Sequence, residues 1–232
     1  MDDRPWGQAS FDSTRDTWLD PHATTDDSAF PWPPGPRLST LDALGETIRR
    51  SLFEPTRFFR AMPRPSPLGA AIVYYALMSV AGAGIMLFWG SVFALLVEPD
   101  GLVAGLLGVG HSDAGSRLLG FLLSPLQSLV GLGIGALIVH AALFIFGGAR
   151  NGLGATFRAL AYTAATQLWV ILPGIGLFVA AAWWFVVAII GLREAHGTTT
   201  GRAAAAVIVP IVGLLALAIV LAGLAAVLSA AP

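Results

Sequence analysis

Four long windows of this chain carry no Asp, Glu, Lys or Arg, and they constrain its fold more than any other feature. The windows are residues 68–97, 118–149, 159–192 and 203–232, which are 30, 32, 34 and 30 residues long. A helix needs about 20 apolar residues to cross the hydrocarbon core of a bilayer. Because each window exceeds that length, and because helices satisfy their own backbone groups in lipid, the windows predict transmembrane helices.

The overall composition excludes the soluble fold classes. Hydrophobic residues make up 56% of the 232 residues and charged residues only 12%, whereas a soluble domain is about 25% charged. A chain of this kind cannot cover a water-facing surface with polar groups. We therefore predict an all-α, polytopic integral membrane protein, with five transmembrane helices in a bundle and a disordered N-terminal tail.

The residue types that are missing exclude several activities. The chain has no Cys and no Lys, and all 13 basic residues are Arg. It therefore lacks a thiolate metal site, a P-loop lysine and a Schiff-base lysine. The net charge of −1 gives no reason to expect a nucleic-acid partner, and we expect no cofactor and no metal.

The first 66 residues divide into two segments. Residues 1–40 hold seven acids and six of the 15 prolines, which predicts a disordered, acidic, Pro-rich cytoplasmic tail without a signal peptide. Residues 41–66 are amphipathic and basic, with Ser39 and Thr40 as N-cap candidates and Pro55 as a helix breaker. This pre-membrane segment is either a collar that flanks the first span or a surface for lipid headgroups or a protein partner. Its candidate contact residues are Arg49, Arg50, Arg57, Phe58, Phe59 and Arg60.

The membrane domain is expected over residues 67–228. The spans are predicted within 67–97 and at about 125–146, 154–172, 175–192 and 201–228. The window 159–192 is divided at Pro173-Gly174, because a single 34-residue helix would be about 51 Å long and a bilayer core is only about 30 Å thick.

Arginine placement predicts the orientation of the spans. With five spans, twelve arginines fall on the side of the N-terminus and Arg117 alone falls on the other. Positive residues favour cytoplasmic loops, so we expect a cytoplasmic N-terminus and an external C-terminus. The abundant Ala and Gly and the missing Lys are typical of high-GC bacteria, which favours the bacterial inner membrane.

Side chains that could carry chemistry are sparse. The sequence contains no nucleophile elbow, no zincin motif and no dinucleotide fingerprint, so we predict no enzymatic activity. His140 is the one side chain inside a span that titrates near neutral pH. Intramembrane ionisable groups are candidates for function, but a histidine that bonds a neighbouring helix is the simpler interpretation of His140.

Two further features of the sequence, a polar segment between two spans and a glycine face on one span, indicate candidate contact surfaces. The segment 191–202 combines Arg193, Glu194, His196 and Arg202, which indicates either a well-capped turn or a docking surface for lipid headgroups or a protein. Gly131 and Gly135 form a G-x-x-x-G face, which suits packing within the bundle or a homo-oligomer.

Four stretches together resemble the Yip-domain integral membrane proteins in their bacterial form. They are residues 55–62 (PTRFFRAM), residues 140–158, the hairpin over 161–176, and the loop 191–202 with the helix that follows it. The resemblance covers about residues 55–228. It implies five spans, a cytoplasmic N-terminus and no catalytic residues; the GTPase-linked trafficking role of the eukaryotic relatives is not implied for a bacterial chain.

Three functional hypotheses follow. The first is a non-enzymatic scaffold or adaptor that binds membrane lipids, or recruits an unknown protein through its tail. The second is a small-solute permease or channel lined by His140, Gln127 and Gln167. The third is a lipid-modifying enzyme that uses Glu194 and His196. The sequence favours the first, because its spans contain almost no titratable groups.

Overall fold

The computed structural model describes residues 30–36, 38–63, 68–96 and 113–230. These residues form helices and contain no strand. The helices are α1 (Thr40–Phe53), α2 (Pro55–Arg60), α3 (Leu68–Leu96), α5 (Ala114–Ile145), α6 (Gly152–Tyr162), the 3₁₀ helix η2 (Thr163–Ile171), α7 (Gly176–His196) and α8 (Thr200–Ala230). Most of the predicted tail, residues 1–29, and the segment 97–112 lie outside the described residues.

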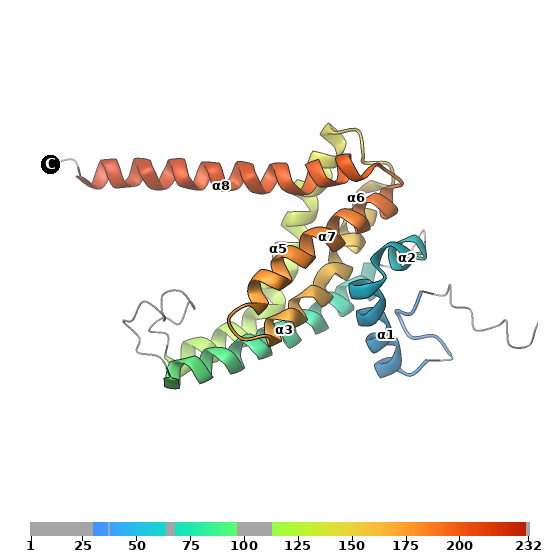
Figure 1. Ribbon diagram of the computed structural model, residues 1–232, viewed down its shortest axis with the longest axis horizontal. Helices are drawn as coiled ribbons and strands as arrows, with labels where there is room; N and C mark the ends of the chain where they lie inside the picture. Colours follow the sequence, from blue (N-terminus) through green and yellow to red (C-terminus); the bar gives the residue numbers. More distant parts are fainter. Residues whose placement is uncertain (1–29, 37, 64–67, 97–112, 231–232) are drawn as a thin grey trace, which may run out of the picture.

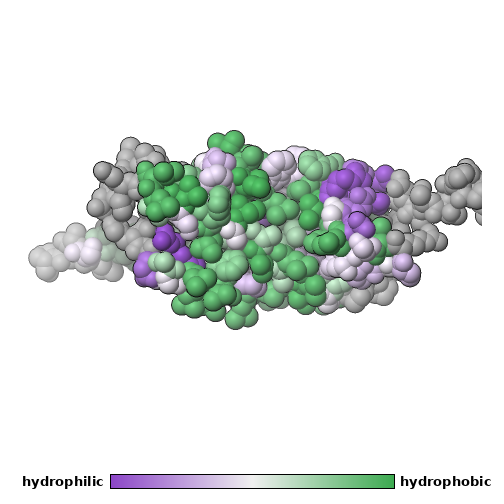
Figure 2. Space-filling view, turned by 90° about the horizontal axis from the view of Figure 1, so that it is seen from below, coloured by the Kyte–Doolittle hydropathy of each residue, from purple (hydrophilic) through white to green (hydrophobic). Residues whose placement is uncertain are grey.

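The connections between helices lie at two opposite ends of the bundle. Helix α2, the turn between α5 and α6 and the turn between α7 and α8 lie at one end, to the right in Figure 1. The end of α3, the hairpin before α7 and the C-terminal end of α8 lie toward the other. Figure 2 shows a broad hydrophobic surface between two hydrophilic regions, of which the larger lies at the α1–α2 end. This distribution is the one expected for helices that cross a bilayer.

The second predicted span is longer than expected, because α5 continues through Pro125. Proline has no backbone N–H, so it leaves the carbonyl four residues earlier without its helical donor. That carbonyl belongs to Phe121, and the Ser124 hydroxyl donates to it at 2.8 Å. Serine side chains commonly satisfy freed carbonyls inside membranes in this way. Residues 118–124, which precede the predicted span, therefore belong to α5.

The third predicted span, 154–172, is not a single α-helix. Helix α6 ends at Tyr162 and continues as η2 to Ile171. Two hydroxyls stabilise the tighter winding, because Thr163 donates to the Leu160 carbonyl at 2.6 Å and Thr166 donates to the Thr163 carbonyl at 2.8 Å. The described residues contain four helices long and apolar enough to cross a membrane, namely α3, α5, α7 and α8. The structure thus supports four of the five predicted transmembrane helices as continuous α-helices.

The segment α6–η2 lies at the centre of the bundle. It packs against α3, α5 and α7, and η2 also contacts α1. Close approach to α3 depends on Gly82, where a Cβ atom would lie 2.9 Å from the Gln167 Oε1 atom. Because this segment is surrounded mainly by protein, it tolerates the Thr, Gln and Arg side chains that a lipid-facing helix would avoid.

The polar loop predicted over 193–202 is mostly helical. Helix α7 continues to His196 and ends at Gly197, which adopts a left-handed conformation with φ 60°. The Thr198 N–H donates to the Arg193 carbonyl at 3.0 Å, which closes the helix end as glycine caps commonly do. Helix α8 then begins at Thr200, with the Thr199 hydroxyl accepting from the Arg202 N–H at 3.4 Å. Only residues 197–199 separate the two helices.

The pre-membrane segment folds against the bundle, as two helices. The Ser39 hydroxyl accepts from the Asp42 N–H and caps α1, and Pro55 begins α2, so both sequence predictions are confirmed. Helix α1 packs on η2 and α2 on α7. The Trp183 indole N–H also donates to the Leu52 carbonyl of α1 at 2.9 Å.

The last part of the predicted disordered tail is ordered against the bundle, which corrects that boundary. Trp32 is 5% exposed, and its indole N–H donates to the Ala70 carbonyl of α3 at 2.7 Å. The Phe30 ring packs on Phe58 and Tyr162, with ring centroids 4.7 and 5.1 Å apart. These two aromatic side chains bury enough surface to order a segment whose proline content alone suggests disorder.

Helix α8 is held only at its base. Its buried residues Ala203, Ala206 and Val207 pack where α8 contacts α5 and α7. Beyond Ile211 the helix extends away from the other helices (Figure 1), and its described side chains are exposed outside the bundle. A hydrocarbon environment is the natural solvent for such a surface.

Candidate functional site

The candidate site is the end of the bundle where the α5–α6 turn meets the α7–α8 turn. Two arginines hold the turns together reciprocally. The Arg150 guanidinium donates to the Gly197 carbonyl at 3.2 Å, and the Arg202 guanidinium donates to the Gly147 carbonyl at 3.1 Å. Both glycines have positive φ, 68° for Gly147 and 60° for Gly197, so these positions favour residues without a Cβ atom.

An ion-pair network joins α2 to the end of α7. The Glu194 carboxylate accepts from the Arg193 guanidinium at 2.8 Å and from Arg60 at 3.3 Å. Arg193 also donates to the hydroxyls of Thr200 and Thr56, at 3.3 and 3.4 Å. The Arg60 side chain is 70% exposed, whereas that of Glu194 is 14% exposed. The network therefore presents positive charge outward and keeps its acid inside.

We call the four arginines at this end, together with Glu194, the basic end of the bundle. Its members are Arg60, Arg150, Arg193, Arg202 and Glu194. Four guanidinium groups against one carboxylate leave a net positive charge at this end. A positive surface at the end of a membrane bundle attracts anionic lipid headgroups.

A buried chain of hydrogen bonds lies directly beneath the basic end. The Thr156 Oγ1 atom lies 2.8 Å from the His140 Nδ1 atom and 2.9 Å from the His196 Nε2 atom. Thr156 is 0% exposed and His196 is 1% exposed. The chain connects α5, α6 and α7, so it fixes three central helices at one level.

If both histidine rings are neutral, the partners of each atom determine which atom donates and which accepts along this chain of hydrogen bonds. The Asn151 N–H donates to the His196 Nδ1 atom at 3.2 Å, so the hydrogen of that ring is on Nε2. The His196 Nε2–H then donates to the Thr156 oxygen, and the Thr156 hydroxyl donates to His140 Nδ1. Each buried polar atom in this chain has a partner, which is what the interior of a protein requires. The Asn151 amide also donates to the Ala195 carbonyl at 2.6 Å.

The histidines identified in the sequence are thus brought together, which their spacing did not predict. His140 and His196 are 56 residues apart in the chain, yet their ring centroids are 5.9 Å apart. The sequence analysis missed Thr156 and Asn151, because a single Thr or Asn on an apolar helix gives no signal of its own. Among the described residues no group of three or more His, Cys, Asp or Glu side chains is arranged to hold a metal ion.

Two other arginine candidates, Arg49 and Arg50, lie on α1 and are paired with acids. Arg49 bonds Glu46 at 2.8 Å and Glu54 at 2.7 Å, and Arg50 bonds Glu46 at 2.6 Å. Hydrogen bonds from Arg49, followed by those from Arg50, lower the pKa of Glu46 to about 2. The same contacts raise the pKa of Arg49. The charge of these two arginines is therefore largely compensated within α1.

The two phenylalanine candidates are inside the protein. Phe58 is 1% exposed and Phe59 is 0% exposed. The Phe58 ring packs on Phe59 and Tyr162, with centroids 5.1 and 5.5 Å apart. Phe59 lies against Gly191 of α7, where a Cβ atom would come within 3.0 Å of the ring. Their role in this structure is to dock α2, which leaves Arg57 and Arg60 as the exposed candidates of that helix.

The other sequence candidates are dispersed. Gln127 is exposed on α5, His140 belongs to the buried chain, and Gln167 lines cavities between α3, α5, η2 and α7. The three side chains expected to line a permeation path therefore do not share one cavity. Gly131 and Gly135 line a cavity of about 150 Å³ with Tyr75 and Trp184, so this face is not tightly packed within the bundle.

Comparisons with known proteins agree with the fold. The family model described as the Yip1 domain matches residues 49–222. No curated protein and no solved structure matches the chain. The matched region begins in α1 and ends in α8, so it contains the basic end and the buried chain.

Proposed function

Because this chain belongs to the Yip1-domain family of membrane proteins, we propose that it is a non-enzymatic scaffold or adaptor whose basic end binds anionic lipid headgroups. The observation that carries the proposal is the presence of four arginines, Arg60, Arg150, Arg193 and Arg202, at one end of the bundle, where two of them pair with Glu194 and the other two bond main-chain carbonyls. Arginine is well suited to such a role, because its planar fork binds phosphate with two parallel hydrogen bonds.

The rest of the site favours a rigid platform over a reactive centre. Glu194 and His196, the pair considered for lipid chemistry, belong to separate networks. Glu194 is held by arginines, and both ring nitrogens of His196 bond Thr156 and Asn151. A general acid or base needs access to a reacting group, and His196 is 1% exposed.

We also propose that the chain crosses the bilayer five times, with α6–η2 as the third span. Eleven α-helical residues at 1.5 Å and nine 3₁₀ residues at 2.0 Å extend about 35 Å, which matches a core of about 30 Å. With five spans, the arginine bias favours a cytoplasmic N-terminus and basic end and an external C-terminus. The composition favours the bacterial inner membrane, and on this proposal any protein partner of the tail would meet it in the cytoplasm.

Headgroup photocrosslinking on the full-length protein in nanodiscs tests the lipid proposal. Phosphatidylglycerol with a photoreactive headgroup should label α2 and the two turns more strongly than the matched phosphatidylcholine. Arg60→Gln and Arg202→Gln should each lower this labelling about fivefold, as expected for about 1 kcal/mol per arginine at a charged surface.

Arg49→Gln is the matched control, because Arg49 is already paired with Glu46 and Glu54. It should leave the labelling unchanged. Equal labelling by the two lipids, or equal loss in all three variants, would contradict the proposal.

A further inference from the structure

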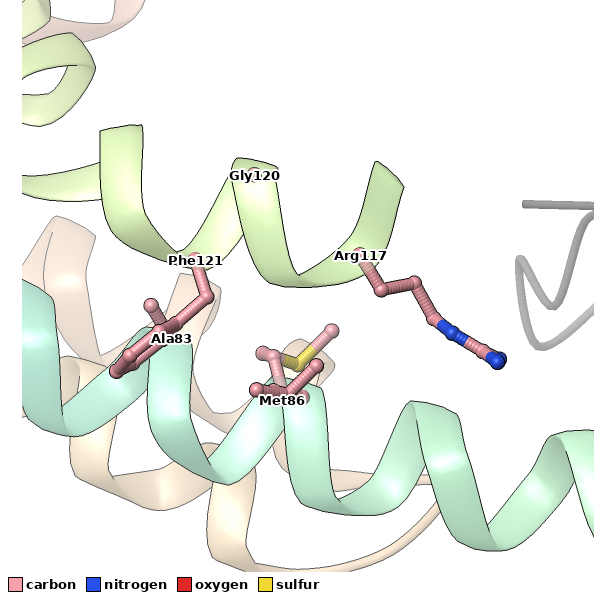
Figure 3. Close-up of a pocket in the computed structure, with 6 residues that line it drawn as sticks. Ala83, Met86, Arg117, Gly120 and Phe121 are labelled. Atoms are coloured by element: carbon pink, nitrogen blue, oxygen red, sulfur yellow. The ribbon is translucent and has the colours of Figure 1, made fainter. Parts of the chain in front are cut away.

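The end of the bundle opposite the basic end carries one arginine beside an apolar groove. Arg117 lies in the first turns of α5 and lines a cavity of about 250 Å³ between α3 and α5. The other lining residues are apolar: Ala83, Met86, Leu87, Gly120 and Phe121. Figure 3 shows Arg117 and Phe121 descending from α5 toward α3 on either side of Met86. The Arg117 guanidinium extends beyond Met86, at the mouth of this groove.

The Arg117 guanidinium has no hydrogen bond or ion pair with the described residues. The acid closest in sequence is Asp113, one turn earlier, and its carboxylate is occupied at the helix N-terminus. It accepts from the Ser116 N–H at 2.8 Å and from the Ser116 hydroxyl at 2.9 Å. Within the described part of the chain the Arg117 guanidinium therefore has no anionic partner, which suits a site for an external anion.

The groove continues into a larger cavity within the bundle. Ala83 and Met86 also line a cavity of about 410 Å³, which lies between α3, α5, η2 and α7. Two hydroxyls in its wall are already engaged with their own helices, because Ser124 donates to the Phe121 carbonyl and Thr166 donates to the Thr163 carbonyl. Ser79, Ser128 and Gln167 also line the larger cavity, whereas the two residues that it shares with the groove, Ala83 and Met86, are apolar, as is typical of sites for apolar ligands.

The combination of an apolar channel and a cation at its mouth matches one class of bilayer molecule. An acyl chain can pack against the apolar walls of the groove. A phosphate at its mouth can accept two parallel hydrogen bonds from the Arg117 guanidinium. An uncharged amphiphile would leave the guanidinium without an anion. A soluble anion would leave the channel walls unfilled.

We propose that the groove between α3 and α5 is a binding site for an anionic phospholipid, with its phosphate on Arg117 and an acyl chain along Ala83, Met86 and Phe121. This site is distinct from the basic end, because it lies at the opposite end of the bundle and is formed by other helices. It does not depend on the proposed scaffold function.

The test uses the full chain in nanodiscs and lipids with a diazirine on the first few carbons of one acyl chain. Phosphatidylglycerol and phosphatidylcholine probes with identical chains are compared, and labelled peptides are mapped by mass spectrometry. For the wild type we expect labels on residues 83–87 and 117–121, about fivefold stronger with phosphatidylglycerol. Arg117→Gln should remove this preference, and Arg117→Lys, which keeps the charge, should retain most of it.

Two glycine variants test the channel itself. A Cβ atom at Gly120 or at Gly213 meets no other atom within 4 Å, so both positions accept a larger side chain. Gly120→Leu should fill the groove and reduce labelling by both lipids, whereas Gly213→Leu on α8 should leave it unchanged. Equal labelling of the groove by the two wild-type probes, or a preference that persists in Arg117→Gln, would overturn the proposal.

Discussion

At the scale of single residues, Thr156 is the junction of the candidate site. Its hydroxyl bridges His140 and His196, and all three side chains lie beneath the four arginines of the basic end. A serine or threonine hydroxyl can donate once and accept in addition, so one side chain satisfies both rings.

Removing the Thr156 hydroxyl should destabilise the bundle. In Thr156→Val the shape is kept, but the facing nitrogens of His140 and His196 lose their partner, which costs about 1–3 kcal/mol for buried polar groups. Unfolding of the purified protein in detergent measures the loss. Thr163→Val is the matched control, since Thr163 is also buried but its hydroxyl bonds the Leu160 carbonyl, three residues earlier in the continuous α6–η2 segment. Its cost should be near 0.6 kcal/mol, as for an average hydrogen bond in a membrane protein. Equal effects of the two variants would contradict the bridging role.

The sequence could identify these histidines as unusual but could not pair them. A polar residue inside an apolar window is visible from composition, and His140 was found in that way. Its partner depends on how α5, α6 and α7 pack, which no local pattern encodes. The burial of Phe58 and Phe59 was missed for the same reason, because an aromatic pair beside arginines suits both an interface and a packed helix.

At the scale of elements, α1 shows how a charged helix lies against an apolar bundle. Its buried residues Ala43, Thr47, Ser51 and Leu52 face the protein, and Glu46, Arg49 and Arg50 form a charged surface on it. Leu41 is 79% exposed, although the 3.6-residue period of an α-helix puts it on nearly the same face as Leu52. The sequence thus located the helix and its N-cap. The contact of α1 with the bundle is made mostly by small residues, and of the leucines only Leu52 is buried.

The ion pairs of Glu46 on α1 should make the stability of the protein depend on pH in the acid range. The pKa of Glu46 is about 2 in the folded protein and 4.5 in its ordinary state. A lowered pKa stabilises the fold above pH 4.5, and this stabilisation is lost as the pH falls from 4.5 towards 2. The melting temperature of Glu46→Gln should therefore lie below that of the wild type at pH 7, with the difference vanishing by about pH 2. The difference should be small, because exposed ion pairs contribute little. A constant difference across this range would contradict the role of the carboxylate.

At the scale of the whole molecule, the sequence predicted the transmembrane helices well and their internal geometry less well. Charge-free windows located α3, α5, α7 and α8, because a segment that lies in hydrocarbon must be apolar over its whole length, which is visible in the local composition. The window 159–192 was correctly divided near Pro173. The 3₁₀ winding of η2 and the passage of α5 through Pro125 were not predicted, because both depend on single hydroxyls that satisfy particular carbonyls.

Reporter fusions test whether α6–η2 crosses the bilayer. Alkaline phosphatase, which is active only outside the cytoplasm, should be active when fused after Pro173 or after Pro232. The same enzyme fused after Gly197 should be inactive, since the turn at Gly197 lies at the basic end, on the cytoplasmic side in the five-span topology. Activity after Gly197 together with inactivity after Pro232 would show that α6–η2 does not cross.

The reciprocal contacts of Arg150 and Arg202 limit how the two turns of the basic end can change. Both guanidiniums bond main-chain oxygens, and a main-chain oxygen is present whatever side chain a residue carries. Apart from the two left-handed glycines, substitutions in these turns leave the acceptors in place. An inserted residue does not, because each added residue displaces the chain by up to about 3.5 Å. The two connections are therefore free to diverge in composition but fixed in length, and insertions there should separate α5 and α6 from α7 and α8.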